Sequence, residues 1–189
     1  YIQNVREQLV LKEHTIKKGG VGILRPSEYK MIRESVKREK QILLDCVLLT
    51  GMRYEELVRL RKNEDWLSGK FIYLPEWAEK KAKKRQRDRT INLSIMGRAI
   101  LPQLFNIKVP SRSAFDKWLS YNFRLIKGLS AKSFRKTYGS WLLSLHPERL
   151  MDIALSQGHD ELTELNHYAK NGLDERDKLE MKEFVEGWT

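Results

Sequence analysis

The chain has 189 residues, which is enough for one domain with a buried core and does not require several domains. Lysine and arginine number 36 against 25 aspartate and glutamate, and the net charge of +11 indicates a polyanionic partner, with nucleic acid as the leading class. No apolar run reaches the ~18 residues of a membrane span, the four histidines lack metal-ligand spacing, and the single cysteine, Cys46, excludes an internal disulfide. We therefore expect no cofactor, no bound metal, no membrane partner and an intracellular, cytoplasmic location.

The first 24 residues combine a weak helical pattern with the sequence Lys17-Lys18-Gly19-Gly20. This pattern predicts a linker or N-terminal arm over residues 1–24, followed by one folded domain over residues 25–189. The first residue is Tyr rather than Met. We expect a piece of a longer protein, whose N-terminal part could hold its own DNA-binding domain.

Helical periodicity dominates the remaining sequence. Before residue 61 the pattern predicts a first helix over residues 27–38, a buried helix over residues 41–49 that Gly51 ends, and a short helix over residues 54–60. Later in the chain the predicted helices span residues 94–105, 113–125, 131–145, 147–156, 161–168 and 174–185.

Two short β-prone runs, residues 71–74 and 90–93, interrupt the helices. They flank a very basic segment, Lys80 to Arg89, so we predict a β-hairpin with a long charged tip. The fold class predicted from these elements is mainly α with a small antiparallel β-sheet (α+β).

Two cations lie three residues apart at the start of the predicted helix over residues 131–145. Residues at this spacing share a helix face, so Lys132 and Arg135 project together. The apolar residues of the same helix fall on another face, toward the core: Phe134, Tyr138, Trp141, Leu142 and Leu145. Such a basic pair taken alone usually marks a solvated helix surface, so its meaning depends on other motifs.

Those other motifs occur in a definite order. The segment from Thr50 to Leu57 reads TGxRxxEL and contains Arg53; Gly158-His159 follows the basic pair, and Tyr168 lies nine positions after His159. This order and spacing resemble the catalytic domain of the tyrosine recombinase (phage-type integrase) family, over roughly residues 26–185. Lys132 stands where the family commonly has His, which is similar to integrases of archaeal viruses and plasmids, so the resemblance suggests an archaeal mobile genetic element.

The resemblance implies the tyrosine recombinase catalytic-domain fold and a site-specific recombinase that cleaves and rejoins DNA strands. Tyr168 would be the nucleophile, forming a 3′-phosphotyrosine, and its ordinary pKa of about 10 means that it needs activation. Arg53 and Arg135 would stabilise charge on the nonbridging oxygens of the phosphate. Lys132 and His159 would add donors to those oxygens or assist proton transfer. The implied partners are double-stranded DNA attachment sites and three further copies of the chain, in a homo-tetramer on DNA.

The family also uses a lysine at the hairpin tip as the general acid for the departing 5′-oxygen. Four lysines of the basic segment are candidates: Lys80, Lys81, Lys83 and Lys84. Counting back from the returning strand favours Lys84, with Lys81 next.

Several alternatives remain open. A type IB topoisomerase shares this chemistry but relaxes supercoils, and a nonenzymatic DNA-binding module would keep the basic face alone. Arg53 could instead be a structural ion-pair partner of Glu56 or Asp45, although we expect Glu56 to orient Arg53 for catalysis. The C-terminal helix, residues 174–188, could pack on a neighbouring protomer or on its own domain.

Overall fold

The computed structural model describes residues 16–18, 21–78, 88–158 and 172–188. These residues form mainly helices, with one antiparallel sheet of three strands and a separate two-stranded hairpin, so the expected mainly α class with a small antiparallel sheet is confirmed. The α-helices are α2 (Pro26–Glu34), α3 (Arg38–Thr50), α4 (Tyr54–Leu60), α5 (Ile95–Ile100), α6 (Arg112–Asn122), α7 (Ala131–Leu145), α8 (Leu150–Gln157) and α10 (Glu175–Val185). The 3₁₀ helices are η1 (Glu64–Trp66), η2 (Glu76–Ala78), η3 (Leu101–Asn106) and η4 (Pro147–Arg149). None of the helices in these ranges has the length and apolar character of a membrane span.

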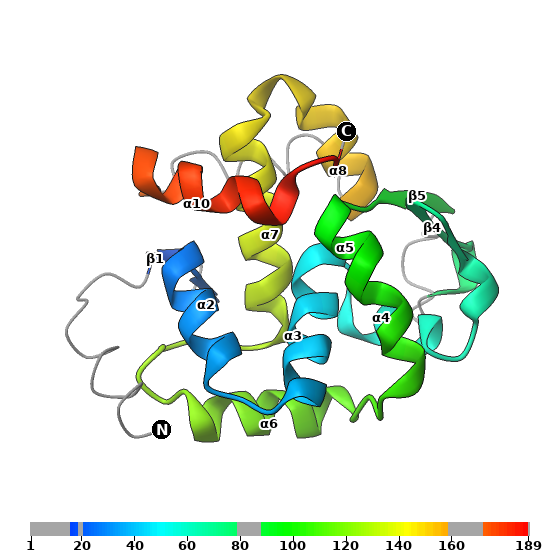
Figure 1. Cartoon of the computed structure of the whole chain (residues 1–189), viewed down its shortest axis with the longest axis horizontal. Coiled ribbons are helices and arrows are strands. Elements are labelled where there is room, and N and C mark those ends of the chain that lie inside the picture. Colours follow the sequence, from blue (N-terminus) through cyan, green and yellow to red (C-terminus); the bar gives the residue numbers. More distant parts are fainter. Residues whose placement is uncertain (1–15, 19–20, 79–87, 159–171, 189) are drawn as a thin grey trace.

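Two contacting helices, α3 and α7, run through the middle of the molecule (Figure 1). Leu44 and Leu48 of α3 are fully buried, which explains why this helix is apolar nearly all round. The predicted apolar stripe of α7 is confirmed, because Phe134 and Trp141 are also fully buried. The C-terminal end of α3 and the first turns of α7 are therefore held firmly by the core.

The C-terminal helix α10 packs on its own domain, against α2, α5 and α7 (Figure 1). The ring centroid of Phe184 lies 5.6 Å from that of Tyr29 and 5.3 Å from that of Trp141. Trp188 is only 1% exposed. Of the two expected positions for this helix, the one on its own domain is found, while Leu179 on its outer face is 67% exposed.

The three-stranded sheet has the order β3 (Leu67–Ser68), β4 (Phe71–Leu74) and β5 (Arg89–Asn92), and both strand pairs are antiparallel. The predicted hairpin is confirmed, with a register that pairs Leu74 with Arg89 and Phe71 with Asn92. Most of its charged tip, residues 79–87, lies outside the described residues. The strand β5 packs against α8, which brings the hairpin beside the end of that helix.

The expected linker differs from the structure at its end. Strand β1 (Ile16–Lys18) pairs with β2 (Val21–Ile23), and β2 lies against α7. Leu24 is fully buried; its N–H donates to Thr137 Oγ1 at 2.9 Å, and its carbonyl accepts from Trp141 Nε1 at 3.0 Å. Ile23 and Leu24 thus belong to the core of the folded domain, because burying these apolar side chains against α7 is favourable.

Predicted helix boundaries shift where local groups compete with the helix. The expected first helix ends at Glu34, where the Ser35 hydroxyl donates to the Ile32 carbonyl oxygen, and a new helix begins at Arg38. Pro102 and Pro147 each fall in 3₁₀ turns, since proline lacks the N–H that continues an α-helix. The predicted helix over residues 161–168 lies outside the described residues.

Replacing Asp45 with Ala is expected to lower the free energy of unfolding by ~2–4 kcal/mol, because it leaves the buried Tyr29 hydroxyl and the partly buried Arg33 guanidinium without their acceptor. Asp45 is fully buried, accepts from Tyr29 Oη at 2.5 Å and pairs with Arg33 Nε at 2.8 Å. Burial and the neighbouring carboxylate raise the pKa of Tyr29, so its phenol remains the donor. Urea unfolding measures the change, and Glu34→Ala, an exposed carboxylate on α2, is the control. Equal losses for the two variants would contradict the role of Asp45.

Candidate active site

The motif around Arg53 joins two helices through a three-residue connection. Gly51 is the C-cap of α3 with φ 57°, a left-handed conformation that glycine adopts without steric penalty. Arg53 is the N-cap of α4, and its N–H donates to Glu56 Oε2 at 2.8 Å. Glu56 therefore caps the helix that begins after Arg53, so the local sequence sets the direction in which Arg53 leaves the backbone.

Arg135 occupies the second turn of α7 and is 8% exposed. Its Nη1 donates to the Gly51 carbonyl oxygen at 3.0 Å, and its Nη2 donates to the Gln157 carbonyl oxygen. Gln157 is the last residue of α8, and Gly158 follows as a left-handed C-cap with φ 65°. Arg135 therefore ties together the C-terminal ends of α3 and α8.

Arg53 reaches the same helix end. Its Nη2 lies 3.5 Å from the Gly158 carbonyl oxygen, next in the chain to the carbonyl that accepts from Arg135. Exposed carbonyls and the helix dipole make a C-terminal helix end favourable for cations. The structure thus brings the two arginines predicted from separate motifs to one place, directly before His159, with the Arg53 side chain 30% exposed and Arg135 more deeply buried.

The remaining predicted site residues divide into two groups. Lys132 is described and exposed, on the first turn of α7 and three residues before Arg135. His159, Tyr168 and Lys84 lie outside the described residues, as do the other three tip lysines, Lys80, Lys81 and Lys83. The described part of the site is therefore the arginine pair with Lys132 nearby on α7.

The expectation for Glu56 is supported by its contacts. Glu56 is fully buried, and its Oε1 lies 3.2 Å from Arg53 Nη1. The alternative role of Arg53, an ion pair with Glu56, involves this same contact. Asp45, the other possible partner of Arg53, pairs with Arg33. The ion pair and the proposed orienting role are compatible, because a buried carboxylate with a partly exposed arginine can hold that arginine in one geometry.

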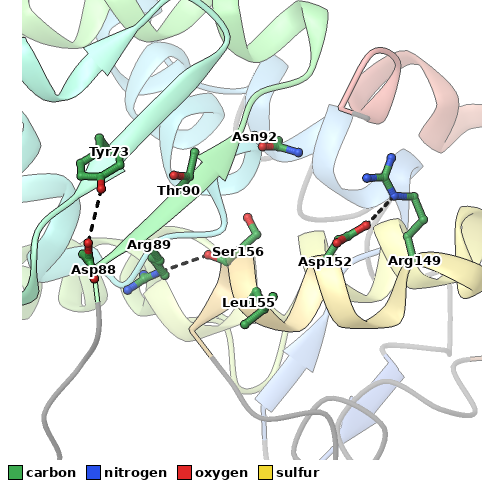
Figure 2. Close-up of a pocket in the computed structure, with 9 residues that line it drawn as sticks. All are labelled: Tyr73, Asp88, Arg89, Thr90, Asn92, Arg149, Asp152, Leu155 and Ser156. Carbon is green, nitrogen blue, oxygen red and sulfur yellow. Dashed lines mark hydrogen bonds and ion pairs between the residues drawn. The ribbon is translucent and has the colours of Figure 1, made fainter.

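The sequence did not single out Arg89, a further charged residue at this place. Arg89 is 8% exposed; its Nη2 lies 2.6 Å from Glu56 Oε2, and its Nε donates to the Ser156 carbonyl oxygen at 3.1 Å (Figure 2). One signal could have found it. Successive residues of a strand face opposite sides, so Arg89 shares a face with the buried Ile91 and needs an acidic partner there.

A cavity of about 390 Å³ lies between the sheet and α8, beside Arg89. Figure 2 shows residues of both elements around it, including Thr90 and Asn92 from β5 and Asp152 from α8. Asp152 pairs with Arg149, the last residue of η4, at 2.8 Å. The cavity therefore places polar groups next to the Glu56–Arg89 contact.

Two tyrosines close to the arginine pair are poor nucleophiles. Tyr54 follows Arg53 in the chain, and Tyr138 lies against Gly51. Burial raises the pKa of both phenols, which disfavours the phenolate.

Replacing Gly51 with Ala is expected to destabilise the fold by more than the same change at Gly69. Both glycines have φ 57°, so each alanine introduces ~1–2 kcal/mol of backbone strain. A Cβ at Gly51 would lie 2.6 Å from Gln157 Nε2, whereas a Cβ at Gly69 would meet nothing within 4 Å. Gln157 Nε2 is the end of a flexible side chain, but Tyr138 Cδ1 would also lie 3.3 Å from this Cβ, so crowding should add ~1 kcal/mol at Gly51 only. Equal free energies of unfolding in urea would show that Gly51 is not closely packed against α8.

The residues at this site are suited to an oxygen-rich anion. Two guanidinium groups at one helix end match the charge and the hydrogen-bonding pattern of a phosphate. Among the described residues, no group of three or more His, Cys, Asp or Glu side chains is arranged to hold a metal ion. In comparisons with family models, curated proteins and solved structures, nothing matches this chain.

Proposed function

We propose that this chain is the catalytic domain of a tyrosine recombinase, a site-specific integrase that cleaves and rejoins DNA through a 3′-phosphotyrosine on Tyr168. One observation carries the proposal. Arg53 and Arg135 come from separate sequence motifs and bond to the carbonyls of Gly158 and Gln157, at the helix end that leads into the segment with Tyr168. A pair of arginines gathered beside the connection to a nucleophile is what phosphoryl transfer to tyrosine requires.

The reaction exchanges one phosphodiester for another. The Tyr168 oxygen attacks phosphorus, the bond from phosphorus to the 5′-oxygen breaks, the phenol loses its proton, and the 5′-oxygen gains one. Attack by the 5′-hydroxyl of a second strand reverses these steps and rejoins DNA. Negative charge grows on the nonbridging oxygens in the pentavalent state, and Arg53 and Arg135 stabilise it as preorganised donors. Glu56 keeps the Arg53 side chain in position, so the guanidinium needs little reorganisation during the reaction.

The other proposed residues supply protons and further donors. Lys132, three residues before Arg135 on α7, and His159 bind the same nonbridging oxygens or assist proton transfer. Lys84 at the hairpin tip protonates the departing 5′-oxygen, with Lys81 as the next candidate. Each role needs a cation or a neutral imidazole near the scissile phosphate.

Double-stranded attachment sites are the proposed substrate, bound by four copies of the chain inside the cell. The net charge of +11 suits a polyanionic duplex, and binding should weaken steeply as salt rises, because neutralised phosphates release their counterions. An archaeal virus or plasmid is the proposed source, on the resemblance of Lys132 to that group of integrases.

Trapping of a covalent adduct tests the proposal. A labelled duplex with a nick near the cleavage site loses a short fragment after cleavage, so the protein stays attached to DNA. We expect an adduct that survives denaturation, mapped by peptide mass to Tyr168. A nonenzymatic module would bind the duplex without an adduct. A type IB topoisomerase would form the adduct and relax supercoiled plasmid, but would not exchange strands between paired attachment sites.

A further inference from the structure

Arg89 connects the hairpin to the arginine pair. It is the first residue of β5, and its guanidinium reaches across to α8, as Figure 2 shows. Its side chain is 6% exposed and the Glu56 side chain is fully buried. The contact joins β5 to the start of α4, and the hydrogen bond to the Ser156 carbonyl oxygen joins it to the end of α8.

Arg89 touches two groups that contact the Arg53 guanidinium. The first is Glu56, whose Oε1 lies 3.2 Å from Arg53 Nη1 and whose Oε2 lies 2.6 Å from Arg89 Nη2. The second is the end of α8, where the Gly158 carbonyl accepts from Arg53, and a Cβ at Gly158 would lie 3.2 Å from the Arg89 guanidinium. A movement of Arg89 would therefore displace two of the groups that contact Arg53.

The charges add a second reason. Arg53, Arg89 and Glu56 taken together carry one net positive charge, and the Arg53 side chain is the most exposed of the three, at 30%. Without Arg89 the charges of Glu56 and Arg53 would cancel, and the Glu56 carboxylate would attract Arg53 more strongly, in competition with a phosphate. Arg89 thus leaves the positive charge of Arg53 available for an external anion.

We propose that Arg89 is a positioning residue for Arg53, acting through Glu56 and the end of α8. This inference rests on the proposed function, since it assigns a task within the same reaction. Arg89 does not touch the DNA in this proposal. Its effect passes through Arg53, and it should therefore disappear when Arg53 is absent.

A double-mutant cycle tests this dependence. Arg89→Met and Arg89→Lys are each made in the native chain and in Arg53→Ala, and the single-turnover rate of adduct formation is measured. We expect Arg89→Met to slow cleavage by about 10–100-fold, less than the ~10²–10³ of a direct donor, with the DNA dissociation constant within about twofold. Arg89→Lys keeps the charge and should cleave at least about fivefold faster than Arg89→Met. In the Arg53→Ala chain, adding Arg89→Met should slow cleavage by less than about a further threefold, because the effects of coupled residues are not additive.

Arg33→Met is the matched control, because Arg33 also pairs with a fully buried carboxylate, Asp45, on α3. It should lower the melting temperature without the rate dependence on Arg53. The inference would be overturned if the rate losses of Arg89→Met and Arg53→Ala multiply in full in the double variant. It would also be overturned if Arg89→Lys cleaves no faster than Arg89→Met, since either result would make Arg89 a structural residue. If Arg89→Met does not fold, Arg89→Lys carries the cycle, and failure of both to fold would also overturn it. A native chain that forms no adduct would instead refute the proposed function, a result distinct from additive losses in a chain that cleaves.

Discussion

Replacing Tyr168 with Phe is expected to abolish the covalent protein–DNA adduct while leaving DNA affinity nearly unchanged. The substitution removes the hydroxyl that attacks phosphorus and no positive charge, and DNA affinity depends chiefly on charge. Adduct is counted on a denaturing gel with labelled nicked DNA, and affinity is measured by fluorescence anisotropy at fixed salt.

Tyr121→Phe is the control for this experiment. Tyr121 is 69% exposed on α6, so its hydroxyl could reach solvent and DNA, yet the proposed mechanism does not use it. This variant should form adduct at the native rate. Adduct at native level in Tyr168→Phe would assign the nucleophile to another residue, and loss of adduct in Tyr121→Phe would point to Tyr121.

Replacing Arg53 or Arg135 with Ala is expected to slow single-turnover cleavage by ~10²–10³, since each removes a preorganised donor to a developing charge. Arg135→Ala should also destabilise the fold, because the carbonyls of Gly51 and Gln157 lose a buried donor. Thermal unfolding separates the two effects. Arg176→Ala removes an equal charge from a side chain that is 84% exposed on α10 and should leave the rate within about threefold of native. If Arg53→Ala slows cleavage by less than tenfold, Arg53 has a structural role and not a catalytic one.

A DNA substrate with sulfur in place of the scissile 5′-oxygen separates charge stabilisation from proton donation. A thiolate leaves without a proton, since a thiol has a pKa of ~8.5 against ~15.7 for water. Arg53→Ala should remain slow on this substrate. The cleavage rate of Lys84→Ala, in contrast, should be largely restored on this substrate if Lys84 is the general acid. If the rate of Lys81→Ala is restored instead, Lys81 is the general acid.

Much of the local structure could be predicted because it depends on near neighbours in the chain. The helix over residues 131–145 is found with those bounds, and the predicted hairpin pairs the strands expected for it. Gly51 ends its helix as predicted, since only a residue tolerant of positive φ fits that cap. The orienting contact of Glu56 with Arg53 is also local, because it spans three residues of one helix start.

The periodicities, the Gly51 cap and the motif residues could be predicted from the sequence alone, since each depends on groups a few positions apart. Which distant groups meet depends on tertiary packing. The contacts of Arg53 with Gly158, of Arg135 with Gly51 and of Arg89 with Glu56 depend on how helices and strand pack, and no local pattern specifies them. The same is true of α10, whose apolar face suits its own domain or a neighbour equally well until the surface formed by α2, α5 and α7 is known. The hydrophobic effect is non-directional, so an apolar face indicates that the helix packs against another surface but does not specify which surface.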